Sequence, residues 1–100
     1  MLPVYISTND DELCCPHCGG YNLHQGTVQV FNRRAEDLPP MAVLIPVSGA
    51  PIQGDPESNP SPRRNGLAIG FMCENCGNMD ENKTLVIFQH KGSTYIRWEE

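Results

Sequence analysis

The sequence predicts a small, β-rich single domain with a thin hydrophobic core. The chain has 100 residues, 39% of them hydrophobic, which fits one domain over residues 1–100. Short runs of apolar and β-branched residues are bounded by turn residues, and no segment carries a convincing helical period. A cysteine motif occurs twice. Because chains of this size often need a metal or disulfides for stability, this motif is central to the prediction.

The strand signal is strongest near the C-terminal end of the chain. Three segments there, Leu67–Met72, Thr84–His90 and Thr94–Trp98, are rich in β-branched and aromatic residues. Lys91-Gly92-Ser93 lies between the last two and is typical of a hairpin turn. We therefore expect an antiparallel three-stranded sheet.

The middle of the chain is predicted to be a long insertion. A short strand is predicted over residues 23–31, before the insertion. The insertion itself is expected to contribute one or two further strands. Residues 41–47 are apolar, but Pro46 makes them an edge strand or a strand end. Residues 48–66 hold four prolines and three glycines, and we expect a flexible, exposed, Pro-rich loop there. Residues 1–12 are expected to be a loosely ordered, acidic lead-in.

Four cysteines stand in two copies of one pattern, Cys-x-x-Cys-Gly. Two intervening residues let both sulfurs turn toward a common point, while backbone amides in the tight turn hydrogen-bond to the thiolates. The glycine that follows allows the chain to leave with a positive φ. Two such knuckles supply four sulfur ligands, which predicts one structural zinc ion in a closed tetrahedral site. The ligands would be Cys15, Cys18, Cys73 and Cys76.

The long interval between the two pairs is compatible with one shared ion. Closing a flexible loop of that length costs roughly 3–4 kcal/mol, whereas zinc binding at such a site contributes on the order of 10–16 kcal/mol. Cys14 is predicted to be a bystander, because the spacing from Cys15 to Cys18 suits a knuckle better. Cys-Pro-His-Cys also occurs in disulfide oxidases of the thioredoxin fold, but Gly19-Gly20 would break the helix that their chemistry needs.

Charge and hydropathy limit the partners. The formal charge is −5, and four zinc-bound thiolates would make it two units more negative, which opposes general attraction to nucleic acid or anionic membranes. No stretch approaches the roughly 20 apolar residues of a membrane span, and we see no secretory signal. An odd number of cysteines also argues against a disulfide-stapled secreted domain, so a cytoplasmic location is expected.

With its knuckles between short strands, the chain resembles the zinc-ribbon superfamily over residues 13–31 and 67–98. More narrowly, the runs 59–67, 71–76 and 89–92 look like those of a group of short, uncharacterised bacterial and phage proteins. The resemblance implies the fold and the metal, and a host-cytoplasmic location if the chain is phage-encoded. The long insertion departs from ordinary ribbons.

Two functions from different classes are compatible with these features. The first is an interaction module for a protein partner, such as a host or cellular regulatory complex, because an exposed sheet edge can accept a strand. The second is a nucleic-acid-binding ribbon, which clustered basic residues would favour. A structural module with no partner is also compatible. The basic candidates are Arg33, Arg34, Arg63, Arg64, Lys91 and Arg97.

Catalysis has no support in the sequence. It has no defensible Ser-His-Asp arrangement, no phosphate loop and no His-Glu pair at metalloprotease spacing. A fully thiolate-ligated zinc leaves no open position to activate water. We therefore expect no enzymatic activity and no small-molecule substrate.

Overall fold

A computed structural model describes Val4, Ile6 and residues 11–33, 39–61, 63–76 and 78–99 of the chain. Within these residues the secondary structure is almost entirely β. The elements are β1 (Leu23–Asn32), β2 (Met41–Ile45), β3 (Ile52–Gln53), the short 3-10 helix η1 (Pro56–Ser58), β4 (Gly66–Cys73), β5 (Asn78–His90) and β6 (Ser93–Glu99).

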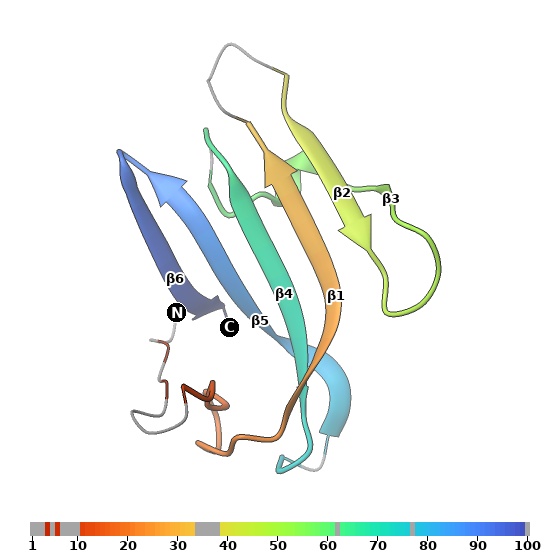
Figure 1. Ribbon diagram of the computed structural model, residues 1–100, viewed down its shortest axis with the longest axis vertical. Helices are drawn as coiled ribbons and strands as arrows, with labels where there is room; N and C mark the ends of the chain where they lie inside the picture. The colour runs from red at the N-terminus through yellow and green to blue at the C-terminus, as the bar shows by residue number, and fades with distance from the viewer. Residues whose placement is uncertain are drawn as a thin grey trace.

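The strands form one antiparallel sheet in the order β3-β2-β1-β4-β5-β6 (Figure 1). The three strands predicted near the C-terminal end are present as β4, β5 and β6. Three more strands extend these three into one sheet, because β1 pairs with β4, β2 with β1 and β3 with β2. A register shift between Gln25 and Val28 interrupts the β1–β4 ladder.

One prediction about the insertion needs correction. Residues 48–66 are not merely an exposed loop, because they contain β3 and η1, and Ser61 is 2% exposed. Of the two alternatives for residues 41–47, the strand end holds, because β2 ends at Ile45, just before Pro46, while β3 pairs with its outer side. The predicted lead-in, residues 1–12, lies mostly outside the described residues.

The two faces of the sheet carry separate hydrophobic clusters, at opposite ends. One face holds Phe31, Ala42, Ala68, Val86 and Phe88. The other face holds Phe71, Leu85 and Trp98 near the cysteine loops, with Val4, Leu13, Leu23 and Ile69 packed against them. The rings of Phe71 and Trp98 meet edge to face, with centroids 5.5 Å apart, and Trp98 is fully buried in this core.

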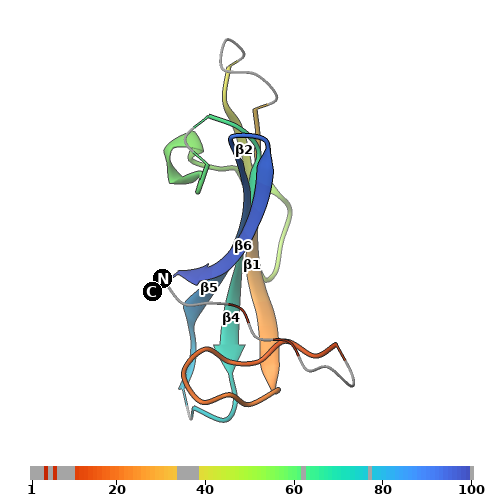
Figure 2. The ribbon, with the colours of Figure 1, turned by 90° about the vertical axis from the view of Figure 1, so that its left-hand side faces the viewer.

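The Pro-rich segment covers the first of these faces. Gly66 is paired with Phe31 on one side and Phe88 on the other, so a side chain at Gly66 would point to their face. A Cβ there would lie 2.2 Å from Asn59 Oδ1 and 3.0 Å from the ring of Pro60. The segment therefore lies directly on the start of β4. Figure 2 shows η1 on one side of the sheet, at the end away from the cysteine loops.

This close approach predicts that Gly66→Ala destabilises the protein by about 1–3 kcal/mol, the usual penalty of overpacking. Thermal or denaturant unfolding measures the change. In an Asn59→Ala background the same substitution is expected to be less harmful, because the closest clashing atom is gone. An equal effect in both backgrounds would contradict the packing described.

Candidate metal centre and basic cavity

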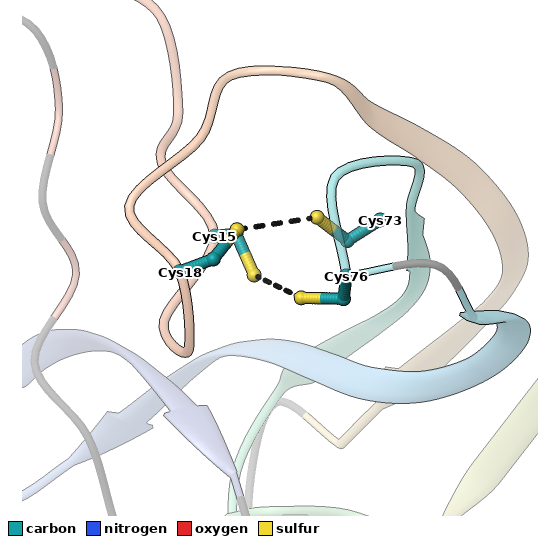
Figure 3. Close-up of side chains that lie close together, drawn as sticks. All are labelled: Cys15, Cys18, Cys73 and Cys76. Atoms are coloured by element: carbon teal, nitrogen blue, oxygen red, sulfur yellow. Dashed lines mark hydrogen bonds between the residues drawn. The ribbon is translucent and has the colours of Figure 1, made fainter.

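The pairing of β1 with β4 brings the two cysteine loops together. The first loop precedes β1 and the second follows β4, and the antiparallel register places Leu23 opposite Cys73. The loops are also joined directly, because the amide of Glu74 donates to the carbonyl of Asn22 at 3.1 Å. As a result, sulfurs more than fifty residues apart in sequence face one another (Figure 3).

The four sulfurs are spaced as ligands of one ion. Cys15, Cys18, Cys73 and Cys76 place their Sγ atoms within 4.8 Å of one another. The sulfurs of Cys15 and Cys76 lie 3.7 Å apart, and those of Cys18 and Cys73 lie 3.6 Å apart. A tetrahedral site with metal–sulfur bonds of about 2.3 Å has sulfurs about 3.8 Å apart. The cluster could therefore hold a metal ion.

Backbone amides of the first loop point at its own sulfurs. The amide of His17 donates to Cys15 Sγ at 3.5 Å, and that of Gly20 donates to Cys18 Sγ at 3.4 Å. Gly19 has a φ of +75°, which a glycine adopts without strain. Such donors stabilise negative charge on sulfur.

Gly20 serves a second purpose, because it lets the two loops approach each other. A Cβ on Gly20 would lie 2.0 Å from Asn75 Nδ2. Asn75 in turn accepts a hydrogen bond from the Asn22 side-chain amide at 3.2 Å. A side chain at position 20 would push the second loop away from the first.

The thiol pKa values show that the cluster needs a cation before all four sulfurs can be ionised. Burial opposes ionisation of Cys15, but hydrogen bonds from the backbone of Cys18 and His17 and from neighbouring thiols outweigh it and lower its pKa to about 7. The thiol of Cys73 is the main cause that raises the pKa of Cys76 to about 12, with burial and the other two thiols adding to it. Four thiols this close cannot all ionise unless a cation offsets their charge.

Cys14 lies outside the cluster, as predicted. Its side chain is half-buried, and its Sγ lies 3.9 Å from the carbonyl oxygen of Glu12. His17 is exposed. His24 on β1 forms an exposed pair with Glu74 of the second cysteine loop, at 3.3 Å between Nε2 and Oε1.

Three of the six predicted basic residues line one cavity at the opposite end of the sheet. This basic cavity has a volume of about 370 Å³ and is lined by Ser61, Arg63, Arg64, Gln89, His90, Lys91 and Gly92. It brings together the start of β4 and the β5–β6 turn. These are parts of two of the sequence runs, 59–67 and 89–92, that carry the resemblance to the bacterial and phage proteins.

The other three basic candidates do not join this cavity. Arg33 lines a neighbouring cavity with Glu57 and Asn59. The guanidinium carbon of Arg97 lies 4.4 Å from the centre of the Phe88 ring, so Arg97 packs on the sheet. Arg34 lies outside the described residues. The structure therefore brings only half of the predicted basic residues together at one site.

Sequence reasoning missed two features. The first is the place of His90 and Ser61 at the basic cavity. The signal for Ser61 was its place in an Asn-Pro-Ser turn, but its partner on β5 is 28 residues away. The other feature is a row of apolar side chains that the sheet leaves exposed, described below.

Comparison of the chain with known protein families, curated proteins and solved structures gives no match. Within the described residues, no helix is both long and apolar enough to cross a lipid bilayer. The candidate function therefore rests on the geometry of this chain alone.

The cluster predicts opposite outcomes for two cysteine substitutions, one inside the cluster and one outside it. Cys73→Ser removes a fully buried thiol of the cluster and is expected to abolish metal retention and leave the chain largely unfolded. Cys14→Ser is the matched control, expected to keep one ion per chain and to change stability by less than about 0.5 kcal/mol. Metal analysis and circular dichroism of the purified proteins check both. Loss of metal from Cys14→Ser, or retention by Cys73→Ser, would contradict the ligand assignment.

Proposed function

We propose that the protein is a structural zinc-binding module that binds a protein partner through one exposed face of its sheet. Support for zinc comes from the donor set, because four cysteine thiolates at tetrahedral spacing are the ligands that structural zinc sites use. Cys15 and Cys73, at 3% and 0% exposed, belong to the interior. The ion would join the segment before β1 to the β4–β5 loop.

The proposal includes no catalytic role for the metal. If the four protein sulfurs bind the ion, they would fill all four tetrahedral positions and leave none for water or substrate. The ion would act on the fold alone.

The observation that carries the partner proposal is an apolar surface across the sheet, called here the open face. In register, Val43 lies beside Val30, Val30 beside Leu67, Leu67 beside Ile87, and Ile87 beside Ile96. These residues therefore share one side of five adjacent strands, opposite to the side covered by the Pro-rich segment. The most exposed members, at 39% to 61%, are Val30, Met41, Val43, Ile45 and Ile96.

The size and chemistry of the open face suit a protein partner. Its most exposed members present on the order of 400 Å² of apolar surface, within the range of the largest patches on monomers, which are often functional. A stable interface buries roughly 800 Å² per partner, with an apolar core and a polar rim. Among the described residues, the open face carries no charged side chain; Gln53, Gln89 and Thr94 lie at its margin. A hollow of about 270 Å³ between Leu67, Ile87 and Thr94 offers an anchor position.

These features favour a partner that presents an uncharged apolar surface of its own. A highly charged partner surface would lose its hydration on this face without gaining ion pairs. The partner first expected, a component of a cellular or host regulatory complex, is compatible with this chemistry.

The nucleic-acid alternative has one observation in its favour, the meeting of Arg63, Arg64 and Lys91 at the basic cavity. Nucleic-acid grooves usually present basic residues along a track that follows successive phosphates. Arg97 lies on the Phe88 ring instead of extending such a track, and the net charge is −5. The open face therefore has the stronger support.

Acidification is expected to release the ion. Cys15 and Cys76, with pKa values of about 7 and about 12 in the metal-free cluster, bind protons well below pH 7. Zinc must displace at least these two protons, so its apparent affinity should fall by at least about 100-fold per pH unit in that range. Competition with a zinc chelator at several pH values measures the slope. A pH-independent affinity would contradict thiolate ligation.

Lysine on the open face is expected to weaken partner binding by about tenfold or more, because a charge would be buried at an apolar contact. Val43→Lys and Ile96→Lys are the test variants. Ile52→Lys is the matched control, since Ile52 is 57% exposed and its register with Leu44 places it on the opposite side of the sheet.

The measurement compares what each variant retains from a native lysate, with metal content and unfolding temperature as folding controls. A protein captured by wild type and Ile52→Lys, but not by the open-face variants, would support the proposal. Equal capture by all variants, or self-association of the wild type through this face with no other protein bound, would contradict it.

A further inference from the structure

We propose that the basic cavity binds the terminal phosphate group of a small ligand. This inference goes beyond the partner proposed above, because the cavity lies at the end of the sheet where β4 begins and β5 meets β6. It depends neither on the open face nor on what docks there.

Side-chain hydrogen bonds hold the arginine-bearing wall of the cavity in place. The Asn59 amide group donates to the carbonyl of Arg64 at 2.8 Å, and its Oδ1 accepts from the amide of Ser61 at 3.0 Å. The Ser61 hydroxyl accepts from the amide of Arg64 at 3.0 Å. The backbone that carries both arginines is therefore pre-organised, which reduces the entropy lost when a ligand binds.

The same segment is bonded to the strand that forms the opposite wall. Ser61 Oγ donates to the carbonyl of Gln89 at 2.7 Å, and the Gln89 amide donates to the carbonyl of Asn65 at 3.1 Å. Just beyond Gln89, the chain turns through Lys91 and Gly92, whose φ values are +50° and +80°. This tight turn, typical of two-residue hairpins, places Lys91 beside the arginines.

The charges at the cavity suit a doubly charged oxyanion. Arg63, Arg64 and Lys91 line it together with His90. Guanidinium groups bind phosphate oxygens through paired donors, and such charge-assisted bonds are stronger than neutral ones. A terminal phosphate offers three oxygens and nearly two negative charges near neutral pH, so it gains more from three cations than a carboxylate or a phosphodiester does.

The dimensions of the cavity indicate that the phosphate belongs to a small molecule. The volume of about 370 Å³ falls within the usual range for small-molecule pockets, and it exceeds what one phosphate group fills. The cavity therefore has space for an organic part next to the phosphate. These cations also concentrate positive charge on a chain of net charge −5, which favours a local ligand over a long anionic strand.

Binding can be tested on the full, metal-loaded chain with inorganic phosphate, a nucleoside 5′-monophosphate, and the same nucleoside without phosphate. We expect the monophosphate to bind with a dissociation constant of about 1 mM or lower and to shift the amide resonances of Lys91 and Gly92. The nucleoside alone should do neither. Tight binding of inorganic phosphate would identify the free ion as the ligand, whereas preference for the monophosphate would identify an organic ester.

Two matched variants test the site. Arg63→Gln combined with Arg64→Gln is expected to weaken monophosphate binding at least about tenfold, while Arg33→Gln, at the neighbouring cavity, should change it less than about twofold. Metal content and unfolding temperature confirm that each variant folds; if the double variant unfolds, Lys91→Met provides the same test from the hairpin.

Three results would overturn the proposal. The first is the absence of phosphate binding at about 10 mM. The second is equal binding by wild type and a folded cavity variant. The third is tight binding of an oligonucleotide without terminal phosphates that inorganic phosphate does not displace, which would favour the nucleic-acid alternative. Phosphate binding at the basic cavity should be the same in the open-face variants, whether or not those variants capture a partner. The two proposals can therefore fail separately.

Discussion

The rest of the structure depends on the contact between the two cysteine loops. A single antiparallel sheet has two faces to bury, and layered domains usually cover both. Here the described residues provide only loops for that purpose. Cys15 and Cys18 converge on Cys73 and Cys76, and this contact holds the segment before β1 in place. Leu13 on that segment, together with Leu23 at the start of β1, can then cover the cluster of Phe71, Leu85 and Trp98. A bound ion at this point would stabilise a core that is too small to do so alone.

The opposite end of the sheet is organised by hydrogen bonds instead of sulfur. The Asn59 side chain bonds to the carbonyl of Arg64 within the Pro-rich segment, Ser61 joins that segment to β5, and Gly66 allows it to lie directly on the sheet. Part of the long insertion therefore packs on the face that carries Phe31 and Phe88. The open face, on the other side of the sheet, leaves apolar side chains in water at a cost in free energy. A partner that covers this face would offset that cost.

The arrangement separates three roles in space. The cysteine cluster lies at one end of the sheet, the basic cavity lies at the other, and the open face lies between them on the side that the Pro-rich segment leaves uncovered. The cysteine cluster and the basic cavity lie at opposite ends of β4, because this strand begins at Gly66, beside the cavity, and ends at Cys73. Folded variants of the basic cavity or of the open face should therefore keep their metal, which allows the partner and the phosphate proposals to be tested separately.

The sequence by itself determined which four cysteines belong to one cluster, and it determined the three strands β4, β5 and β6. Both rest on local signals: a repeated cysteine spacing, and runs of β-branched residues around a two-residue turn. It also indicated Cys14 as a bystander. Only the tertiary structure decided the width of the sheet, the packing of residues 54–61 and 63–65, and the meeting of Arg63 and Arg64 with Lys91. These features depend on pairings between residues far apart in the chain, such as Ser61 with Gln89 and Val30 with Leu67. No local pattern specifies such partners, because they are selected by which long-range contacts can form together.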